Sequence, residues 1–254
     1  MGRVTADAVA VACFPLTPWS GRISGGGITL GDRFWPLPQN RPPDVPLHGD
    51  GWESPWTVVE HTDTRLELSL RSRRLPPFDY RATMVYAIGG DTLTIELAME
   101  HRGAETVPYG IGLHPWFPRT PGTRLTAPAT EVWLEDERHL PTAVVPVSAR
   151  PDWDFATRRP LPDSWVCNAF DGWTREARID WEESGIALDI AADAALPTYL
   201  LYAPSPDAGF FCFEPVSHPM DAHNWPGRPG LVELRKGERL ASSCSFTVSR
   251  RRKG

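Results

Sequence analysis

The strongest constraint on the fold is a two-residue alternation of apolar and polar side chains that recurs along the chain. In residues 65–71, three leucines alternate with charged or hydroxyl side chains, and 80–88, 92–99 and 240–248 follow the same rule. Successive side chains of a strand point to opposite faces of its sheet, so this period predicts strands with one buried face. No run of ten residues or more shows the period of an amphipathic helix.

Turn signals organise these strands into hairpins. Gly89-Gly90-Asp91 separates two alternating runs, and Glu183-Ser184-Gly185 divides the segment 177–190 in the same way. Both patterns predict antiparallel hairpins. Further strands are expected at 199–202, 209–213 and 230–234.

No linker or change of composition divides the chain, and its 27 prolines suit strands joined by shaped loops. The predicted fold class is therefore all-β, a large antiparallel β-sandwich. Residues 1–254 are expected to form one domain.

Charge and composition exclude several classes of partner. The formal net charge of −6 argues against nucleic acid, and the basic cluster at 250–253 is interpreted as a solvated tail. The apolar stretch 8–14 is too short to span a membrane and lacks the features of a signal peptide. Four cysteines without paired spacing predict reduced thiols and no metal site. We expect a cytoplasmic protein.

Two proline-rich loops, 36–56 and 138–168, carry polar and aromatic residues. Long loops over a rigid sheet often hold binding sites, and the first loop contains Asn40, His48 and Trp52. The chain also has 11 tryptophans, whose flat rings can stack on the apolar face of a sugar. The ordinary alternative for any one of them is a place in the core.

Two short segments each place a proton-handling side chain directly before a proline: His114-Pro115 and Glu214-Pro215. The residue before proline is pushed into an extended conformation, so both side chains should lie on strand-like backbone. Glu214 ends an apolar run, where burial would raise its pKa towards neutrality and suit it to act as a base. Each residue taken singly also has an ordinary interpretation: His114 could have a structural role, and Glu214 could point to solvent or pair with an arginine.

In combination, the segments of this chain resemble the aldose 1-epimerases, also called galactose mutarotases. The resemblance runs from Phe14-Pro15-Leu16 to the final strand. Its carriers, in family order, are Ser20-Gly21-Arg22-Ile23, Asn40 with Leu47-His48-Gly49, Gly112-Leu113-His114-Pro115-Trp116-Phe117, Phe213-Glu214-Pro215 with Asp221-Ala222-His223-Asn224, and Leu234-Arg235-Lys236-Gly237-Glu238.

The resemblance implies a function and a set of site residues. It implies interconversion of the α and β anomers of a free aldose by ring opening and closure, with His114 as general acid and Glu214 as general base. Arg22 and His48 would contact the sugar. Asn40, Trp52 and Cys167 complete the expected substrate-binding set. No cofactor is expected, the partner is a small sugar, and a homodimer is left open.

This chain departs from the family pattern at three places. Family members usually carry two or more strands before the segment that begins here at residue 8, so the first family strands are expected to be missing. Gly21 precedes Arg22 where asparagine is common. Cys167 stands three residues before Phe170, where the family often has a sugar-binding aspartate, and Asp163 or Asp171 are candidates to replace it. This loss should weaken or redirect sugar selection.

Three alternatives remain beside a mutarotase for free aldoses. One is a sugar-binding protein that kept the fold and lost turnover. Another is an epimerase for a phosphorylated or modified sugar, for which Arg41 and Arg119 are candidate contacts. A glycoside hydrolase is disfavoured, because that chemistry needs two spaced carboxylates and the sequence offers one strong candidate.

Overall fold

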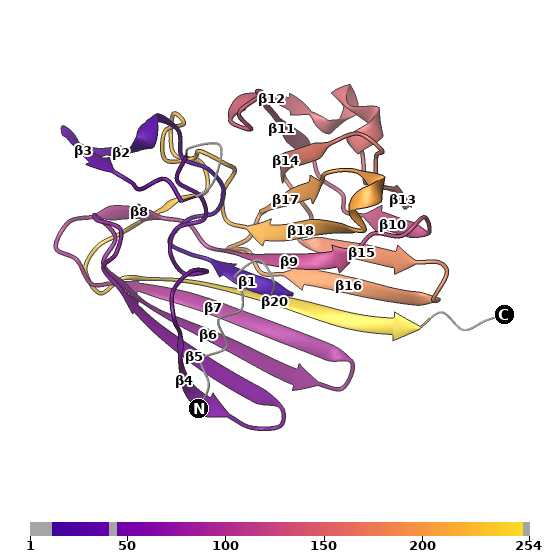
Figure 1. Ribbon diagram of the computed structural model, residues 1–254, viewed down its shortest axis with the longest axis horizontal. Helices are drawn as coiled ribbons and strands as arrows, with labels where there is room; N and C mark the ends of the chain where they lie inside the picture. Colours follow the sequence, from indigo (N-terminus) through magenta and orange to yellow (C-terminus); the bar gives the residue numbers. More distant parts are fainter. Residues whose placement is uncertain (1–11, 41–44, 251–254) are drawn as a thin grey trace.

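Two large antiparallel sheets dominate the structure, a computed structural model that describes residues 12–40 and 45–250 (Figure 1). The first sheet has seven strands, in the spatial order β1 (Cys13–Leu16), β9 (Gly112–Pro118), β18 (Phe210–Val216), β17 (Thr198–Ala203), β14 (Val166–Asp171), β11 (Glu131–Glu135) and β12 (Pro141–Pro146). The second has nine strands, in the order β13 (Arg159–Pro160), β10 (Thr123–Thr126), β15 (Glu176–Trp181), β16 (Ile186–Ala192), β20 (Arg239–Arg250), β7 (Thr92–His101), β6 (Tyr80–Gly89), β5 (Arg65–Ser72) and β4 (Thr57–His61).

Smaller elements complete the described chain. Two two-stranded ribbons, β2 (Gly27–Leu30) with β3 (Arg33–Pro36) and β8 (Val107–Tyr109) with β19 (Val232–Leu234), lie at one end of the sheets (Figure 1). The helical content of the described residues consists of short 3₁₀ turns: η2 (Ser24–Gly26), η3 (Val147–Ala149), η4 (Pro151–Trp153) and η5 (Pro206–Ala208). Within the same residues, no helix has the length and apolar character needed to cross a bilayer.

The predicted all-β class and both predicted hairpins are confirmed. β6 and β7 pair as far as Gly89 and Thr92, and β15 and β16 pair as far as Trp181 and Ile186. The four strands with the clearest alternation, β5, β6, β7 and β20, are neighbours in the nine-stranded sheet. Predicted strand 209–213 continues through a proline to Val216, and predicted strand 230–234 is shorter and joins a small ribbon.

The hydrophobic core fills the space between the two sheets. Tyr199 on β17 is fully buried and stacks against Phe213 at 4.6 Å and against Phe170 at 4.7 Å between ring centroids. Trp173 meets both Tyr199 and Phe213 edge to face. Aromatic pairs in these geometries add to the gain from burial alone. The strand that carries Glu214, the candidate base, is therefore packed against an aromatic layer on its inner face.

Replacement of Phe213 by alanine should test this layer. The change removes a fully buried ring from between Tyr199 and Trp173, and we expect it to lower the free energy of unfolding by about 3–5 kcal/mol. Urea denaturation followed by tryptophan fluorescence measures the loss. Phe34→Ala is the control, since Phe34 is 52% exposed and should cost less than about 0.5 kcal/mol. Equal losses in the two variants would contradict the assignment of the core.

Candidate functional site

The pairing of β9 with β18 brings the two predicted proton-handling residues together. Cys212 pairs with Trp116 and Val216 with Gly112, so His114 and Glu214 lie opposite each other midway between these pairs. The His114 Nε2 and Glu214 Oε1 atoms are 3.2 Å apart. A hundred residues of sequence separate two side chains that the sheet places in direct contact.

Burial sets the protonation of this pair. The side chains of His114 and Glu214 are 8% and 4% exposed. Burial raises the pKa of Glu214 to about 8, and the positive charge of Arg22 opposes this rise without cancelling it. Burial lowers the pKa of His114 to about 3. At neutral pH the pair is therefore uncharged and holds one exchangeable proton on the carboxyl group.

Each member of the pair also has a buried polar atom without a partner. Among the described residues, Glu214 Oε2 and His114 Nδ1 are buried and have no hydrogen-bond partner. Buried polar atoms without partners are rare and need an explanation, such as a water or a substrate. The His114 ring itself is fixed by stacking on Phe14 at 4.3 Å and on Trp116 at 5.4 Å.

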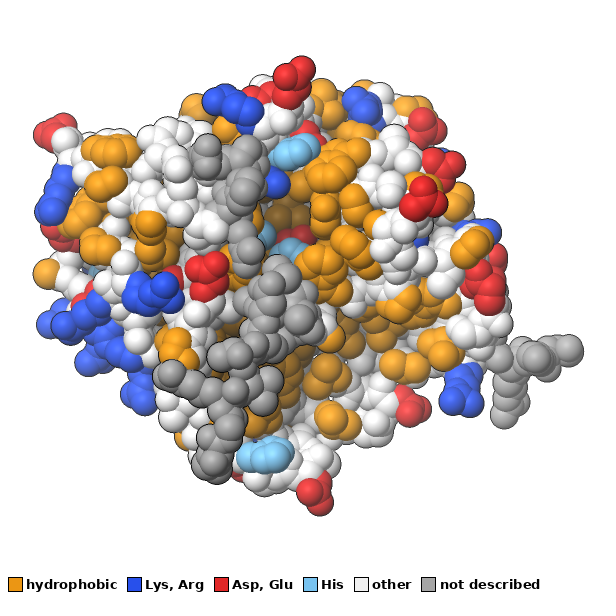
Figure 2. Space-filling model, viewed as in Figure 1, with side chains coloured by type: hydrophobic (Ala, Val, Ile, Leu, Met, Phe, Trp, Pro, Cys, Tyr) orange, Lys and Arg blue, Asp and Glu red, His pale blue; other side chains and the backbone are white. Residues whose placement is uncertain are grey.

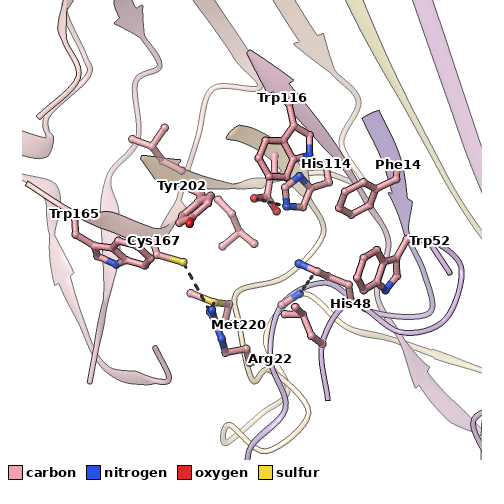
Figure 3. A pocket seen from close by; sticks show the side chains of 15 residues that line it. Phe14, Arg22, His48, Trp52, His114, Trp116, Trp165, Cys167, Tyr202 and Met220 are labelled. Carbon is pink, nitrogen blue, oxygen red and sulfur yellow. Dashed lines mark hydrogen bonds and ion pairs between the residues drawn. The ribbon is translucent and has the colours of Figure 1, made fainter. Parts of the chain in front are cut away.

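His48 enters the site from the loop after β3. The Gly21 amide donates to His48 Nδ1 at 3.0 Å, so the proton of the neutral ring is on Nε2, which faces the cavity (Figure 3). Burial is the main cause that holds the pKa of His48 well below its usual value. The ring crosses that of His114 edge to face at 5.3 Å. His48 is therefore a neutral hydrogen-bond donor beside the acid–base pair.

The loop that carries His48 is anchored on both sides. The Asn40 amide donates to the Leu47 carbonyl at 3.0 Å and accepts from the Leu47 amide at 2.9 Å. Two residues beyond His48, the buried Asp50 carboxylate accepts from the Tyr80 hydroxyl at 2.6 Å and from Ser72. Because Tyr80 is on β6 and Ser72 on β5, the nine-stranded sheet fixes the position of this imidazole.

The pair opens into a cavity of about 290 Å³. Figure 2 shows a hollow on this face with histidine and acidic side chains at its floor and hydrophobic side chains around it. Six predicted site residues line the cavity, and they come from β9, β14, β18 and two loop segments: Arg22, His48, Trp52, His114, Cys167 and Glu214 (Figure 3). Its lining is mainly apolar, with few polar groups to orient a ligand, as is usual for a small-molecule site.

The comparisons with known proteins agree with this architecture. A family model described as Aldose 1-epimerase matches residues 3–247. The chain belongs to the aldose 1-epimerase family.

A protein of Escherichia coli K12 named "Uncharacterized protein YphB" is 37% identical to this epimerase-family chain over 97% of the chain and 87% of its own length. A crystal structure from the same organism, described as a "Putative aldose 1-epimerase", superposes with a TM-score of 0.89 at 35% identity. It covers 98% of this chain and 87% of the other. The structure of galactose 1-epimerase from Lactobacillus acidophilus has a TM-score of 0.76 at 17% identity, with coverage of 93% and 79%, and shows the shared fold.

The structure departs from several expectations for this family member. Asn40 does not line the cavity, because both ends of its amide hold Leu47; we reassign it as a positioning residue for the His48 loop. Asp171 accepts from Trp133 at 2.6 Å and from Thr198 at 2.5 Å, so it does not replace the aspartate missing at Cys167. The Asp163 side chain is 94% exposed, outside the cavity.

Neither arginine that was predicted to contact a phosphorylated substrate is found in the lining of the described cavity. Arg119 is only 6% exposed, donates to the Pro162 carbonyl at 2.7 Å and is absent from the cavity lining. Arg41 lies outside the described residues. Among the described residues that line the cavity, Arg22 supplies the only cationic side chain other than histidine.

Sequence reasoning did not assign nine of the lining residues to the site, and five of them have large side chains that can contact a ligand: Phe14, Trp116, Trp165, Tyr202 and Met220. Trp116 was visible in the segment around His114, two residues along the same strand and hence on the same face. Tyr202 and Met220 gave no such signal, because their approach to the cavity depends on sheet order and on the path of the loop after β18.

One donor set near the cavity could hold a metal. Ligand atoms of His114, Cys212 and Glu214 lie within 4.8 Å of one another. Burial strongly raises the pKa of the Cys212 thiol and also keeps Glu214 protonated near neutral pH. A metal would therefore have to displace two protons from buried groups, which weakens binding at neutral pH.

The raised pKa of Glu214 predicts a pH dependence of stability. Between its ordinary value of 4.5 and about 8, the folded protein keeps a proton that the unfolded chain has lost, so stability falls as pH rises. Glu214→Gln removes this effect. We expect the variant to gain about 2–4 kcal/mol relative to the parent between pH 5 and pH 8, from about 1.4 kcal/mol for each unit of pH.

Urea unfolding at both pH values measures this gain. Glu233→Gln is the matched control, because Glu233 is on the surface and pairs with Arg228. An unchanged difference between parent and Glu214→Gln across the two pH values would show that the carboxyl group is ionised in the folded protein.

Proposed function

We propose that this protein is an aldose 1-epimerase that interconverts the α and β anomers of an aldose. The observation that carries the proposal is the contact of 3.2 Å between His114 and Glu214, each with an unpartnered polar atom, at the floor of a 290 Å³ cavity. This volume lies at the lower end of small-molecule sites, roughly 300–1,000 Å³, and suits one monosaccharide. Family membership supports the same class of reaction.

The proposed reaction moves two protons. The Glu214 carboxylate takes the proton of the anomeric hydroxyl, the C1–O1 bond becomes a carbonyl, and the C1–O5 bond breaks. His114 gives its proton to O5 as that bond opens. Rotation about C1–C2 presents the other face of the aldehyde, and closure reverses both transfers. The redox state does not change at any step, and every proton returns to its donor.

The one-proton state of the pair suits this chemistry. The resting form has a neutral carboxyl and a neutral imidazole, and transfer of that proton gives the carboxylate and imidazolium needed for ring opening. The overall charge of the pair is zero in both forms, so only charge separation has to be stabilised. The nearby Arg22 charge favours the carboxylate form, and the Nε2 proton of His48 can donate to a sugar oxygen.

Two other readings are less well supported by the site. A glycoside hydrolase needs two carboxylates, and Glu214 is the one carboxylate among the described residues that line the cavity. A sugar-binding protein without turnover would have no need for an acid and a base in contact. Such a protein would quench tryptophan fluorescence on adding sugar yet leave the rate of anomer exchange unchanged.

Loss of either member of the pair should abolish catalysis. We expect Glu214→Gln and His114→Asn each to lower the catalysed rate of anomer exchange by ~100- to 10,000-fold, because each removes one proton transfer. Exchange spectroscopy by NMR, after subtraction of the uncatalysed rate, is the measurement. Glu233→Gln and His61→Asn, both at exposed residues, should retain the parent rate. Full activity in both pair variants would rule out the proposed mechanism.

The dependence of kcat/KM on pH should show the loss of the proton that Glu214 and His114 share. Because the active pair holds one proton, kcat/KM should stay level towards neutral pH and fall about tenfold per unit above pH 8, where Glu214 loses that proton. The measurement is the same exchange assay between pH 5 and pH 10 with the spontaneous rate subtracted. A catalysed rate that continues to rise above pH 8 would assign activity to the deprotonated pair instead.

A further inference from the structure

Arg22 is a cation in the cavity that lacks an acidic partner. Its Nη1 donates to Met220 Sδ at 3.5 Å and to Cys167 Sγ at 3.8 Å, and no carboxylate among the described residues forms an ion pair with it. Sulfur is a weak acceptor, and a guanidinium in partly buried surroundings is normally paired with an anion. The sulfur contacts position Arg22 without neutralising it.

Nothing else lining the described cavity offsets this charge. Burial raises the pKa of the Cys167 thiol to about 12, so the thiol is neutral. His48 and His114 are neutral, and Glu214 holds its proton near neutral pH. Aromatic rings form much of the cavity lining, and Arg22 is itself partly buried, so its charge is less well solvated than at an exposed position. The side chains that line the cavity therefore carry about one positive charge between them, and Glu135, which acts electrostatically on Cys167, lies outside this lining.

The position of Arg22 indicates which part of a sugar meets it. Figure 3 places Arg22 and Met220 across the cavity from His114, with Cys167 beside them. If the anomeric carbon lies at His114 and Glu214, then Arg22 faces a substituent on the far side of the ring. The backbone holds this arginine in place, because its carbonyl accepts from the Asp221 amide at 2.9 Å and Ser20 is tied to His218 at 3.0 Å.

We propose that the substrate is an anionic aldose, with a carboxylate or phosphate on a carbon remote from C1, and that Arg22 binds this group. A guanidinium can hold such an anion with two parallel hydrogen bonds, and the geometry leaves Arg22 available for it. This inference rests on the proposed function and names its substrate class. Cys167 acts as a specificity determinant, because a carboxylate at its position would neutralise Arg22 from within.

The first test compares each neutral sugar with its charged derivatives. Anomer exchange is measured by NMR at pH 7 for D-glucose, D-glucuronate and D-glucose 6-phosphate, and for the three galactose counterparts. We expect kcat/KM for at least one anionic sugar to exceed that of its neutral parent by ~10- to 100-fold, the effect of a charge-assisted hydrogen bond. The uronate and phosphate arms distinguish a compact carboxylate from a larger phosphate.

The second test places a counter-ion beside Arg22. Cys167→Asp should lower the ratio of kcat/KM for the anionic sugar to kcat/KM for its neutral parent by tenfold or more. The reason is that the new carboxylate forms an ion pair with the Arg22 guanidinium. Cys167→Asn is the control of matched shape without charge, and it should leave this ratio within about threefold of the parent. A similar fall in both variants would point to packing rather than charge and would overturn the proposal.

The outcomes separate this inference from the proposed function. Faster exchange of neutral sugars, with no gain for any anionic one, would overturn the anionic substrate and leave the epimerase activity standing. Absence of catalysed exchange for all six sugars would overturn both. A preference for an anionic sugar that is lost in Cys167→Asp and kept in Cys167→Asn is the result that supports the proposal.

Discussion

The site depends on one strand pairing, that of β9 with β18. The pairing sets His114 opposite Glu214, and β1 on the other side of β9 sets Phe14 against the same imidazole. A shift of one residue in either strand would turn one of the two side chains to the other face of the sheet. Phe117 on β9 and Phe211 on β18 are paired in this register, and their ring centroids lie 5.7 Å apart.

Burial and charge act in opposite directions within the cavity. Desolvation raises the pKa of Glu214, while the attraction of Arg22 lowers it, and the net rise to about 8 shows that desolvation is the larger effect. An ionised carboxylate at this place would have offset part of the charge of Arg22 from across the cavity. Because the carboxyl is protonated instead, the same desolvation that prepares a base leaves the arginine without a counter-charge.

The supporting contacts tie the site to both sheets. Asp50 connects the His48 loop to β5 and β6, whereas His114, Cys167 and Glu214 stand on β9, β14 and β18 of the seven-stranded sheet. A cavity built in this way can change its selectivity through single side chains while the scaffold remains. Cys167 is such a position, because its side chain contacts Arg22 and is only partly buried at the edge of the smaller hydrophobic cluster.

The sequence by itself determined the most regular strands and the candidate acid–base pair. Period-two alternation needs only local side-chain order, and His114 and Glu214 stand in segments whose neighbouring prolines impose extended backbone. Tertiary structure decided what those residues meet. Asn40 matched a family motif, yet its side-chain amide forms hydrogen bonds with the backbone of Leu47 and does not line the cavity. Tyr202 and Met220 line the cavity, although no sequence pattern had indicated it. The sequence gives the identity of each side chain, but the order of the strands and the paths of the loops decide which side chains come into contact. Within the described part of the chain, Arg22 lacks an acidic partner for this reason, because the fold places two sulfur atoms beside it.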